Sequence, residues 1–188
     1  MNSWMIILLV LVVLIVLIGI YAAGVYNSLI RSRNQVKEAY STMDVLLLKR
    51  SDLIPDLVAT VKASAAHESE TLQNVVEARA KAISSNDQES RLAAENQLSQ
   101  GISNLLIVAE SYPELKASSN FIQMQNDLRS METEIENSRR YYNGTVKYHN
   151  NAVSVFPANI FAGMFNFHTE ALFVVEDEAK KEKPKVEF

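Results

Sequence analysis

The sequence predicts an all-α protein in which an N-terminal transmembrane helix continues into a long antiparallel four-helix bundle. The first observation is an uncharged N-terminal stretch, since no Asp, Glu, Lys or Arg precedes Arg31. The second is the recurrence of apolar residues at spacings of three and four through the remainder of the chain, which is typical of amphipathic helices. The third is that 5 Gly and 4 Pro in 188 residues are too few for the many turns of an all-β fold.

The uncharged residues 4–25 form the predicted transmembrane helix. At about 1.5 Å per residue they extend about 33 Å, which is enough to cross a hydrocarbon core of about 30 Å. Trp4 at one end and Tyr21 and Tyr26 at the other are the predicted membrane anchors, because aromatic rings favour the headgroup region. A cleaved signal peptide is the alternative, supported by the small residues at 22–24. The length of the apolar run and the absence of a preceding Lys or Arg argue against it.

The basic residues near this helix predict its orientation. Residues 1–3 carry no Lys or Arg, whereas Arg31, Arg33 and Lys37 follow the apolar run closely. The positive-inside rule therefore predicts a single-pass protein with a short extracytoplasmic N-terminus and its C-terminal part in the cytoplasm.

Polar and proline-containing breaks divide residues 26–156 into the four helices of the predicted bundle. We expect the first helix to end near Ser51 and Asp52, with Asp52 capping the second helix and Pro55 in its first turn. The remaining breaks are expected at residues 84–87, 112–113 and 118–120. The fourth helix carries a long apolar seam of the kind found in bundles and coiled coils, so we expect the chain to form a homo-oligomer.

The segment 157–175 differs from the bundle because it is rich in aromatic residues. Ile160, Phe161, Met164 and Phe165 share one face of a predicted short helix. This face either closes the end of the bundle or contacts lipid or another subunit, because amphipathic aromatic segments settle at membrane interfaces. The tail 176–188 mixes acidic and basic residues and is expected to be solvated.

No pattern of residues predicts a catalytic, cofactor or metal site. The three histidines, His67, His149 and His168, lack the partners of a zinc-protease helix or of a di-iron bundle, so each is interpreted as a surface or satisfied core residue. Glu132, Glu134 and Glu136 alternate along one helix, which spreads them over different faces as a solvated acidic surface. With no Cys and a net charge of -4, thiolate chemistry, disulfides and a nucleic-acid partner are also excluded.

The densest polar and aromatic cluster is the run beginning with Arg139, Arg140 and Tyr141. Two interpretations remain open for these residues. Arg and Tyr side chains can cover a bundle seam with their apolar parts, or they can contact a partner protein through stacking of Arg on Tyr.

The chain resembles the LemA family through motifs spread over nearly its whole length. The motifs occur at residues 50–58 (RSDLIPDLV), 112–116 (YPELK), 120–121 (NF), 139–143 (RRYYN), 156–157 (FP) and 159–160 (NI). Three residues depart from the family pattern: Asp56 stands in place of Asn, Asn166 in place of a Gly, and His149 is an additional histidine. The resemblance implies a helical bundle tethered to the bacterial inner membrane with its short N-terminus outside. It also implies a membrane-organising role, and it brings no catalytic residue.

These observations lead to three hypotheses about function. The first is a non-enzymatic, membrane-anchored scaffold that self-associates and organises membrane lipid or partner proteins. The second is a membrane-tethered signalling or adaptor module that binds a soluble or membrane protein. The third is an enzyme, which is disfavoured because a site in a bundle needs inward-facing polar groups that the sequence does not predict.

Overall fold

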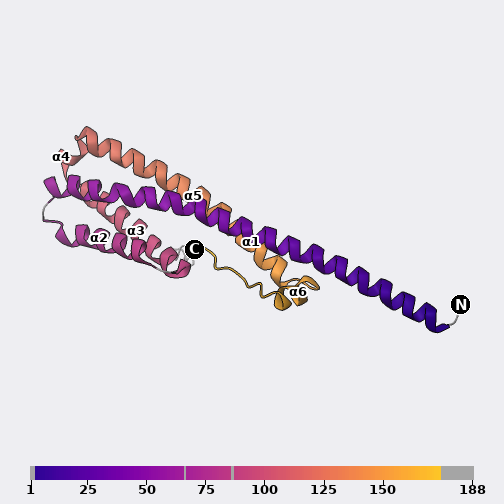
Figure 1. Ribbon diagram of the computed structural model, residues 1–188. Helices are drawn as coiled ribbons and strands as arrows, with labels where there is room; N and C mark the ends of the chain where they lie inside the picture. Colours follow the sequence, from indigo (N-terminus) through magenta and orange to yellow (C-terminus); the bar gives the residue numbers. More distant parts are fainter. Residues whose placement is uncertain (1–2, 66, 86, 175–188) are drawn as a thin grey trace, which may run out of the picture. The chain divides into compact units, whose positions relative to one another are not determined.

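The computed structural model describes residues 3–65, 67–85 and 87–174, and every regular element in these ranges is a helix (Figure 1). The elements are α1 (Ser3–Ser64), α2 (Ser69–Ser84), α3 (Gln88–Ala109), α4 (Pro113–Lys116), α5 (Ser119–Ser154) and α6 (Ala158–Met164). The predicted all-α fold is therefore confirmed. The predicted solvated tail, 176–188, lies outside the described residues.

The chain folds into two compact units, and α1 and α5 each contribute to both. Of the described residues, 3–42 and 140–172 belong to unit 1, and 43–65, 67–85, 87–139 and 173–174 belong to unit 2. The apolar N-terminal half of α1 belongs to unit 1, whereas α2, α3 and α4 belong entirely to unit 2.

Unit 2 is an antiparallel helical bundle formed by the end of α1, by α2 and α3, and by the start of α5 (Figure 1), whereas the range expected for the bundle, residues 26–156, also includes parts of unit 1. Its core consists of apolar side chains repeated at helical spacing, which is how each helix buries one face against its neighbours. Fully buried examples are Ile54, Leu57, Val61, Val75, Leu98, Leu105, Phe121 and Leu128. Gly101 allows α2 and α3 to approach closely, since a Cβ there would lie 3.3 Å from Cγ2 of Val75.

The prediction that the first helix ends at Ser51 and Asp52 is wrong. α1 continues to Ser64 with Pro55 inside it, and the chain turns instead before Ser69. The buried stripe explains the difference: Leu47, Ile54 and Val61 are all fully buried at seven-residue intervals, so a break at residue 51 would remove the last two from the core.

The other expected breaks agree with the structure. Asp87 caps α3, because its carboxylate Oδ1 accepts a hydrogen bond of 2.8 Å from the Ser90 backbone N–H. α3 ends at Ala109, and Pro113 begins α4, where the missing N–H of proline has no helical partner to lose. α5 ends at Ser154, shortly before Pro157.

Unit 1 pairs the first part of α1 with the end of α5 and with α6. Leu29 of α1 packs against the buried side chains of Ala162 and Phe167. Further along the pair, the rings of Tyr40 and Tyr142 lie 6.0 Å apart. Asn166, just after α6, has a φ of 58°, a left-handed conformation that Gly and Asn adopt most readily. Asn is therefore a suitable residue at this position.

Candidate functional site

Arg50 on α1 is a fully buried cation in unit 2. Its Nη2 donates to Oε2 of Glu95 at 2.6 Å, and its Nη1 donates to Oε1 of Glu132 at 2.5 Å. The hydroxyl oxygen of Ser99 accepts another hydrogen bond from Nη1 at 2.6 Å. These four residues, here called the Arg50 cluster, join α1, α3 and α5 within the bundle.

Burial and charge act in opposite directions on the carboxyl group of Glu95. Burial raises the pKa of Glu95 above its ordinary value of 4.5, and the adjacent Arg50 guanidinium partly offsets this effect. Burial also lowers the pKa of the neighbouring Arg139, and the charge of Arg50 adds to that effect. Because Arg50 is paired with two carboxylates and is shielded from water, the arrangement is that of a structural ion-pair cluster.

The sequence analysis did not predict the Arg50 cluster, and the cluster shows that the expectation for Glu132 was wrong. Glu132 is not part of a solvated acidic face, because its carboxylate pairs with Arg50, whereas Glu134 and Glu136 are exposed. The sequence does contain an indication of this cluster, because Arg50 lies between the buried Leu47 and Ile54 at helical spacing. A charged residue within an apolar stripe indicates a buried ion pair.

His149 is a satisfied core histidine in unit 1, which is one of the two roles that the sequence analysis left open. Its Nε2 lies 3.1 Å from the carbonyl oxygen of His168, and its Nδ1 lies 2.8 Å from Oγ of Ser32. A carbonyl oxygen can only accept, so Nε2 of His149 carries a hydrogen, and Ser32 in turn donates its hydroxyl hydrogen to the carbonyl oxygen of Leu29 at 2.9 Å. His67 and His168 are exposed. No group of three metal-ligating side chains occurs within residues 3–65, 67–85 and 87–174.

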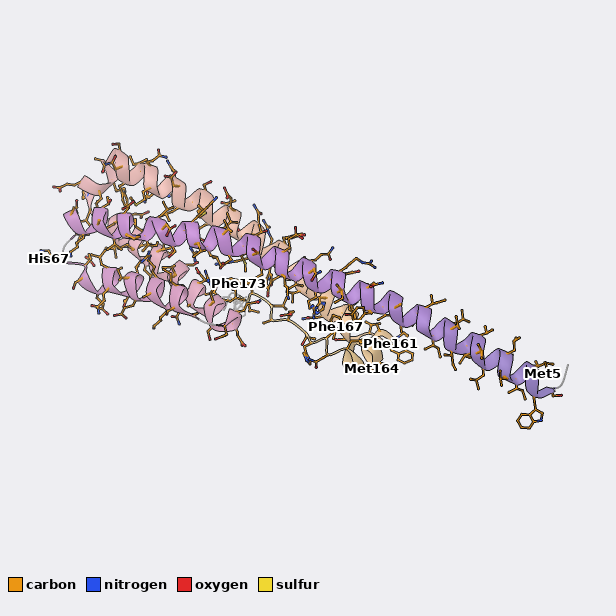
Figure 2. The ribbon with its side chains drawn as sticks, viewed as in Figure 1. Met5, His67, Phe161, Met164, Phe167 and Phe173 are labelled. Atoms are coloured by element: carbon orange, nitrogen blue, oxygen red, sulfur yellow. The ribbon has the colours of Figure 1, made fainter. Side chains whose placement is uncertain are left out.

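Two of the predicted membrane anchors, Tyr21 and Tyr26, contact the aromatic segment, in which Figure 2 labels Phe161, Met164 and Phe167. The ring of Tyr21 lies 5.8 Å from that of Phe161. The ring of Tyr26 lies 4.9 Å from that of Phe165 and 5.9 Å from that of Phe167. α6 therefore packs beside the end of the apolar run of α1. Trp4, at the opposite end of that run, is exposed.

The predicted face of α6 is only partly used for this packing. Phe161 is half-buried and Phe165 contacts Tyr26, whereas Ile160 and Met164 remain largely exposed at 53% and 72%. The face thus combines contacts to α1 with an outward apolar surface.

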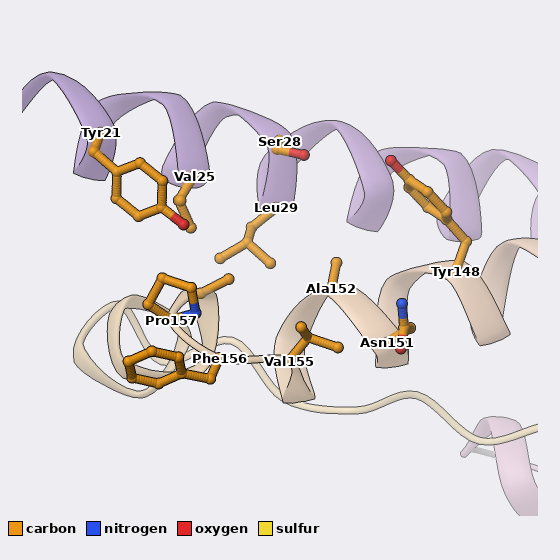
Figure 3. A pocket seen from close by; sticks show the side chains of 11 residues that line it. Tyr21, Val25, Ser28, Leu29, Tyr148, Asn151, Ala152, Val155, Phe156 and Pro157 are labelled. Carbon is orange, nitrogen blue, oxygen red and sulfur yellow. The ribbon is translucent and has the colours of Figure 1, made fainter.

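A groove of about 320 Å³ opens beside α6, between α1 and the end of α5 (Figure 3). One part of its wall is apolar and includes Val25, Leu29 and Val155. Hydroxyl and amide groups of Ser28, Tyr148 and Asn151 line the remainder. A groove with an apolar part and a neutral polar part suits an amphipathic molecule.

The three predicted partner-contact residues have different environments in the structure. Arg139 is half-buried, with its guanidinium carbon 4.1 Å from the centre of the Phe173 ring. Arg140 and Tyr141 are exposed on α5. Arg139 therefore covers apolar surface, and the exposed pair retains the surface position that a partner contact requires.

Comparison with known proteins identifies the family. The family model described as "LemA family" matches residues 39–188. The chain belongs to the LemA family. It is also similar to Protein LemA of Metamycoplasma hominis, with 25% identity over 148 residues that cover 78% of this chain and 68% of that protein.

LemA membership agrees with the architecture described above. The family match includes the whole of unit 2 and the α5–α6 part of unit 1. One helix of the described residues, α1, is long and apolar enough to cross a membrane. The chain is therefore a membrane-anchored, helical member of the LemA family.

Proposed function

We propose that this LemA-family protein is a non-enzymatic, membrane-anchored scaffold that self-associates and organises membrane lipid or partner proteins. The observation that carries the proposal is the continuity of α1, a helix of 62 residues that begins in the apolar run and ends in the bundle core. No loop separates the predicted membrane span from the bundle. A continuous helix without a flexible linker can hold a protein surface close to a membrane.

Self-association is supported by exposed apolar side chains on the bundle. Val45 and Leu48 lie three residues apart on α1 and are both exposed within unit 2. Residues at this spacing are neighbours on one helix face, and an exposed apolar pair of this kind can pack against a helix of a second copy.

The experiment that tests the scaffold is mass photometry of the full-length protein in detergent and in lipid nanodiscs. We expect oligomers for the unaltered chain and fewer oligomers for the double substitution Val45→Lys and Leu48→Lys. Asn126→Lys, which adds a charge at another exposed position in unit 2, is the matched control and should leave the oligomer distribution unchanged. Monomers of the unaltered chain at every concentration would contradict self-association.

For the location, we propose the bacterial inner membrane, with a short N-terminus outside and the bundle in the cytoplasm. Arg31, Arg33 and Lys37 support this orientation through the positive-inside rule. The chain has no cysteine, so single cysteines at Ser3 and Gln123 can be labelled with a membrane-impermeant maleimide in intact cells. We expect labelling at Ser3 alone; labelling at Gln123 alone would reverse the orientation.

The adaptor function is a second candidate, supported by the exposed pair Arg140 and Tyr141 on α5. Crosslinking in cells distinguishes the two functions. Crosslinks between copies of this chain favour the scaffold, and a single dominant crosslinked partner, lost on Tyr141→Ala, favours the adaptor.

A further inference from the structure

The end of the predicted membrane span fixes the depth of α6. Tyr21 and Tyr26 mark the last turns of the apolar run, and their rings contact Phe161 at 5.8 Å and Phe165 at 4.9 Å. A helix rises about 1.5 Å per residue, so the two tyrosines are about 7.5 Å apart along α1, which is comparable to the thickness of one headgroup layer. When α1 spans the bilayer, α6 consequently lies at the level of the lipid headgroups.

The outward surface at this level is apolar. Phe156 and Met164 are exposed at 75% and 72%, and Ile160 at 53%. In water, three exposed large apolar side chains on and just before one short helix are unfavourable, whereas an interfacial environment accommodates them.

The pattern of charge in this part of the chain also matches a lipid surface. No Asp, Glu, Lys or Arg occurs between Lys147 and Glu170, a stretch that includes the end of α5 and all of α6. On α1, Arg31 is exposed one turn beyond Ser28, and no acidic residue precedes Glu38. Uncharged side chains at headgroup depth, with basic side chains just beyond them, complement a bilayer that carries anionic headgroups.

We propose that α6 and the adjacent groove form a second lipid-binding surface, which contacts the same leaflet in which the apolar run of α1 ends. The outward side chains of Ile160 and Met164 enter the headgroup and upper acyl region. An acyl chain of a bilayer phospholipid occupies the apolar part of the groove beside Val25 and Val155. The neutral polar groups of Ser28, Tyr148 and Asn151 face the glycerol and phosphate of that lipid (Figure 3). This goes beyond the scaffold proposal and does not depend on self-association.

Quenching of tryptophan fluorescence by brominated lipid tests this contact directly. The full-length chain is placed in liposomes that contain phosphatidylcholine brominated near the headgroup end of one acyl chain. Trp4→Phe removes the single native tryptophan. Separate single-tryptophan variants then carry Ile160→Trp or Met164→Trp on α6, or Val155→Trp in the groove. These sites are exposed, so a larger ring can be accommodated without opening the core.

Two reference positions calibrate the quenching. Tyr21→Trp reports the end of the membrane span. Tyr141→Trp is the matched control, since it is an exposed α5 residue of unit 1 about 20 Å from Val155 along the helix. We expect quenching at 155, 160 and 164 comparable to that at 21 and clearly above that at 141. Quenching no greater than at 141, in variants whose circular dichroism matches the parent, would overturn the proposal.

A second copy of the chain is the competing occupant of this face. Met164→Cys introduces the only thiol in the chain, so oxidation of this variant in liposomes reports contact between copies. Efficient disulfide-linked dimers together with weak quenching at 160 and 164 would overturn lipid binding. Strong quenching with no dimer would support it.

Discussion

The side chain of Arg79 on α2 donates a hydrogen bond of 2.9 Å from Nε to the backbone carbonyl oxygen of Ser51 on α1. In a regular helix this carbonyl would accept from the N–H four residues later, but that residue is Pro55, which has no N–H. Ser51 is buried, so water cannot easily replace the missing donor. A side chain from a neighbouring helix thus supplies the hydrogen bond that the proline removes, and α1 continues.

Removal of the Arg79 side chain should destabilise α1 only while Pro55 is present. We expect Arg79→Met to lower the free energy of local opening of α1 by about 1–3 kcal/mol, the typical cost of an unsatisfied buried carbonyl. In a Pro55→Ala background the backbone N–H is restored, so the same substitution should cost much less. Amide hydrogen exchange of the full-length chain in nanodiscs, measured on peptides covering residues 47–61, provides these values. Equal costs in the two backgrounds would contradict this role for Arg79.

The two partners of the buried ion pair between Arg50 and Glu95 should respond differently to removal. Glu95→Ala leaves the buried Arg50 cation, which cannot lose its proton, with Glu132 as its remaining carboxylate partner, and we expect a destabilisation of about 3 kcal/mol, the lower end of the range for a broken buried pair. Arg50→Met should cost less, because Glu95 can take up a proton and become neutral. The double substitution should be less destabilised than Glu95→Ala alone. Amide hydrogen exchange in α3 measures the destabilisation of all three variants.

A half-exposed ion pair in the same unit serves as the control. Nη2 of Arg91 lies 2.7 Å from Oδ1 of Asp44. Asp44→Ala should cost about 0.2–1 kcal/mol, as expected for pairs in contact with water. A loss as large as that of Glu95→Ala would show that burial does not set the energetic difference.

The raised pKa of Glu95 predicts a specific dependence of stability on pH. A carboxyl group with a raised pKa binds its proton more tightly in the folded state. Its contribution to stability is therefore fully present below its ordinary value of 4.5 and is lost as the pH rises through the raised pKa. Relative to Glu95→Gln, which cannot titrate, the unaltered protein should lose stability from pH 4.5 upward. A relative gain of stability over this range would mean that the attraction of Arg50 outweighs burial.

Two helical glycines should differ in their response to alanine. Gly144 on α5 has open space around it, so Gly144→Ala should stabilise that helix by about 0.5–1 kcal/mol through a reduced cost of ordering the backbone. Gly101→Ala should gain less or lose stability, because its methyl group would lie 3.3 Å from Val75. Hydrogen exchange in α5 and α3 compares the two. The double substitution Gly101→Ala with Val75→Ala would remove this close contact. It would also place a smaller side chain at residue 75 in the core.

Asn150 should hold the segment that follows α6. Its side-chain amide donates to the carbonyl oxygen of Glu170 at 2.9 Å, and its Oδ1 accepts from the Glu170 backbone N–H at 2.8 Å. Asn150→Ala removes both bonds, and we expect faster hydrogen exchange at residues 168–172. The neighbouring Asn151→Ala, at an exposed position, is the control. Unchanged exchange in Asn150→Ala would show that the segment is held by other contacts, such as the bond of 2.7 Å from the Tyr142 hydroxyl to the carbonyl oxygen of Ala171.

Local sequence patterns are sufficient to predict the helical class, the apolar span, a helical bundle and most helix boundaries. These features depend on local information, namely the spacing of apolar residues, the cap at Asp87 and the breaks at Pro113 and Pro157. The structure confirmed each of these because nearby residues in the chain decide them.

The contacts between polar groups on different helices, by contrast, are not predictable from such local patterns. Pro55 predicts a helix start when it is considered with its neighbours alone, and the decisive hydrogen bond comes from Arg79, 28 residues away from Ser51. Arg50 and Glu132 are likewise 82 residues apart, and the contact of α6 with Tyr21 joins distant segments. Such pairings depend on how helices pack in three dimensions, since periodicity indicates which face of a helix is buried but does not specify the residues that lie opposite it.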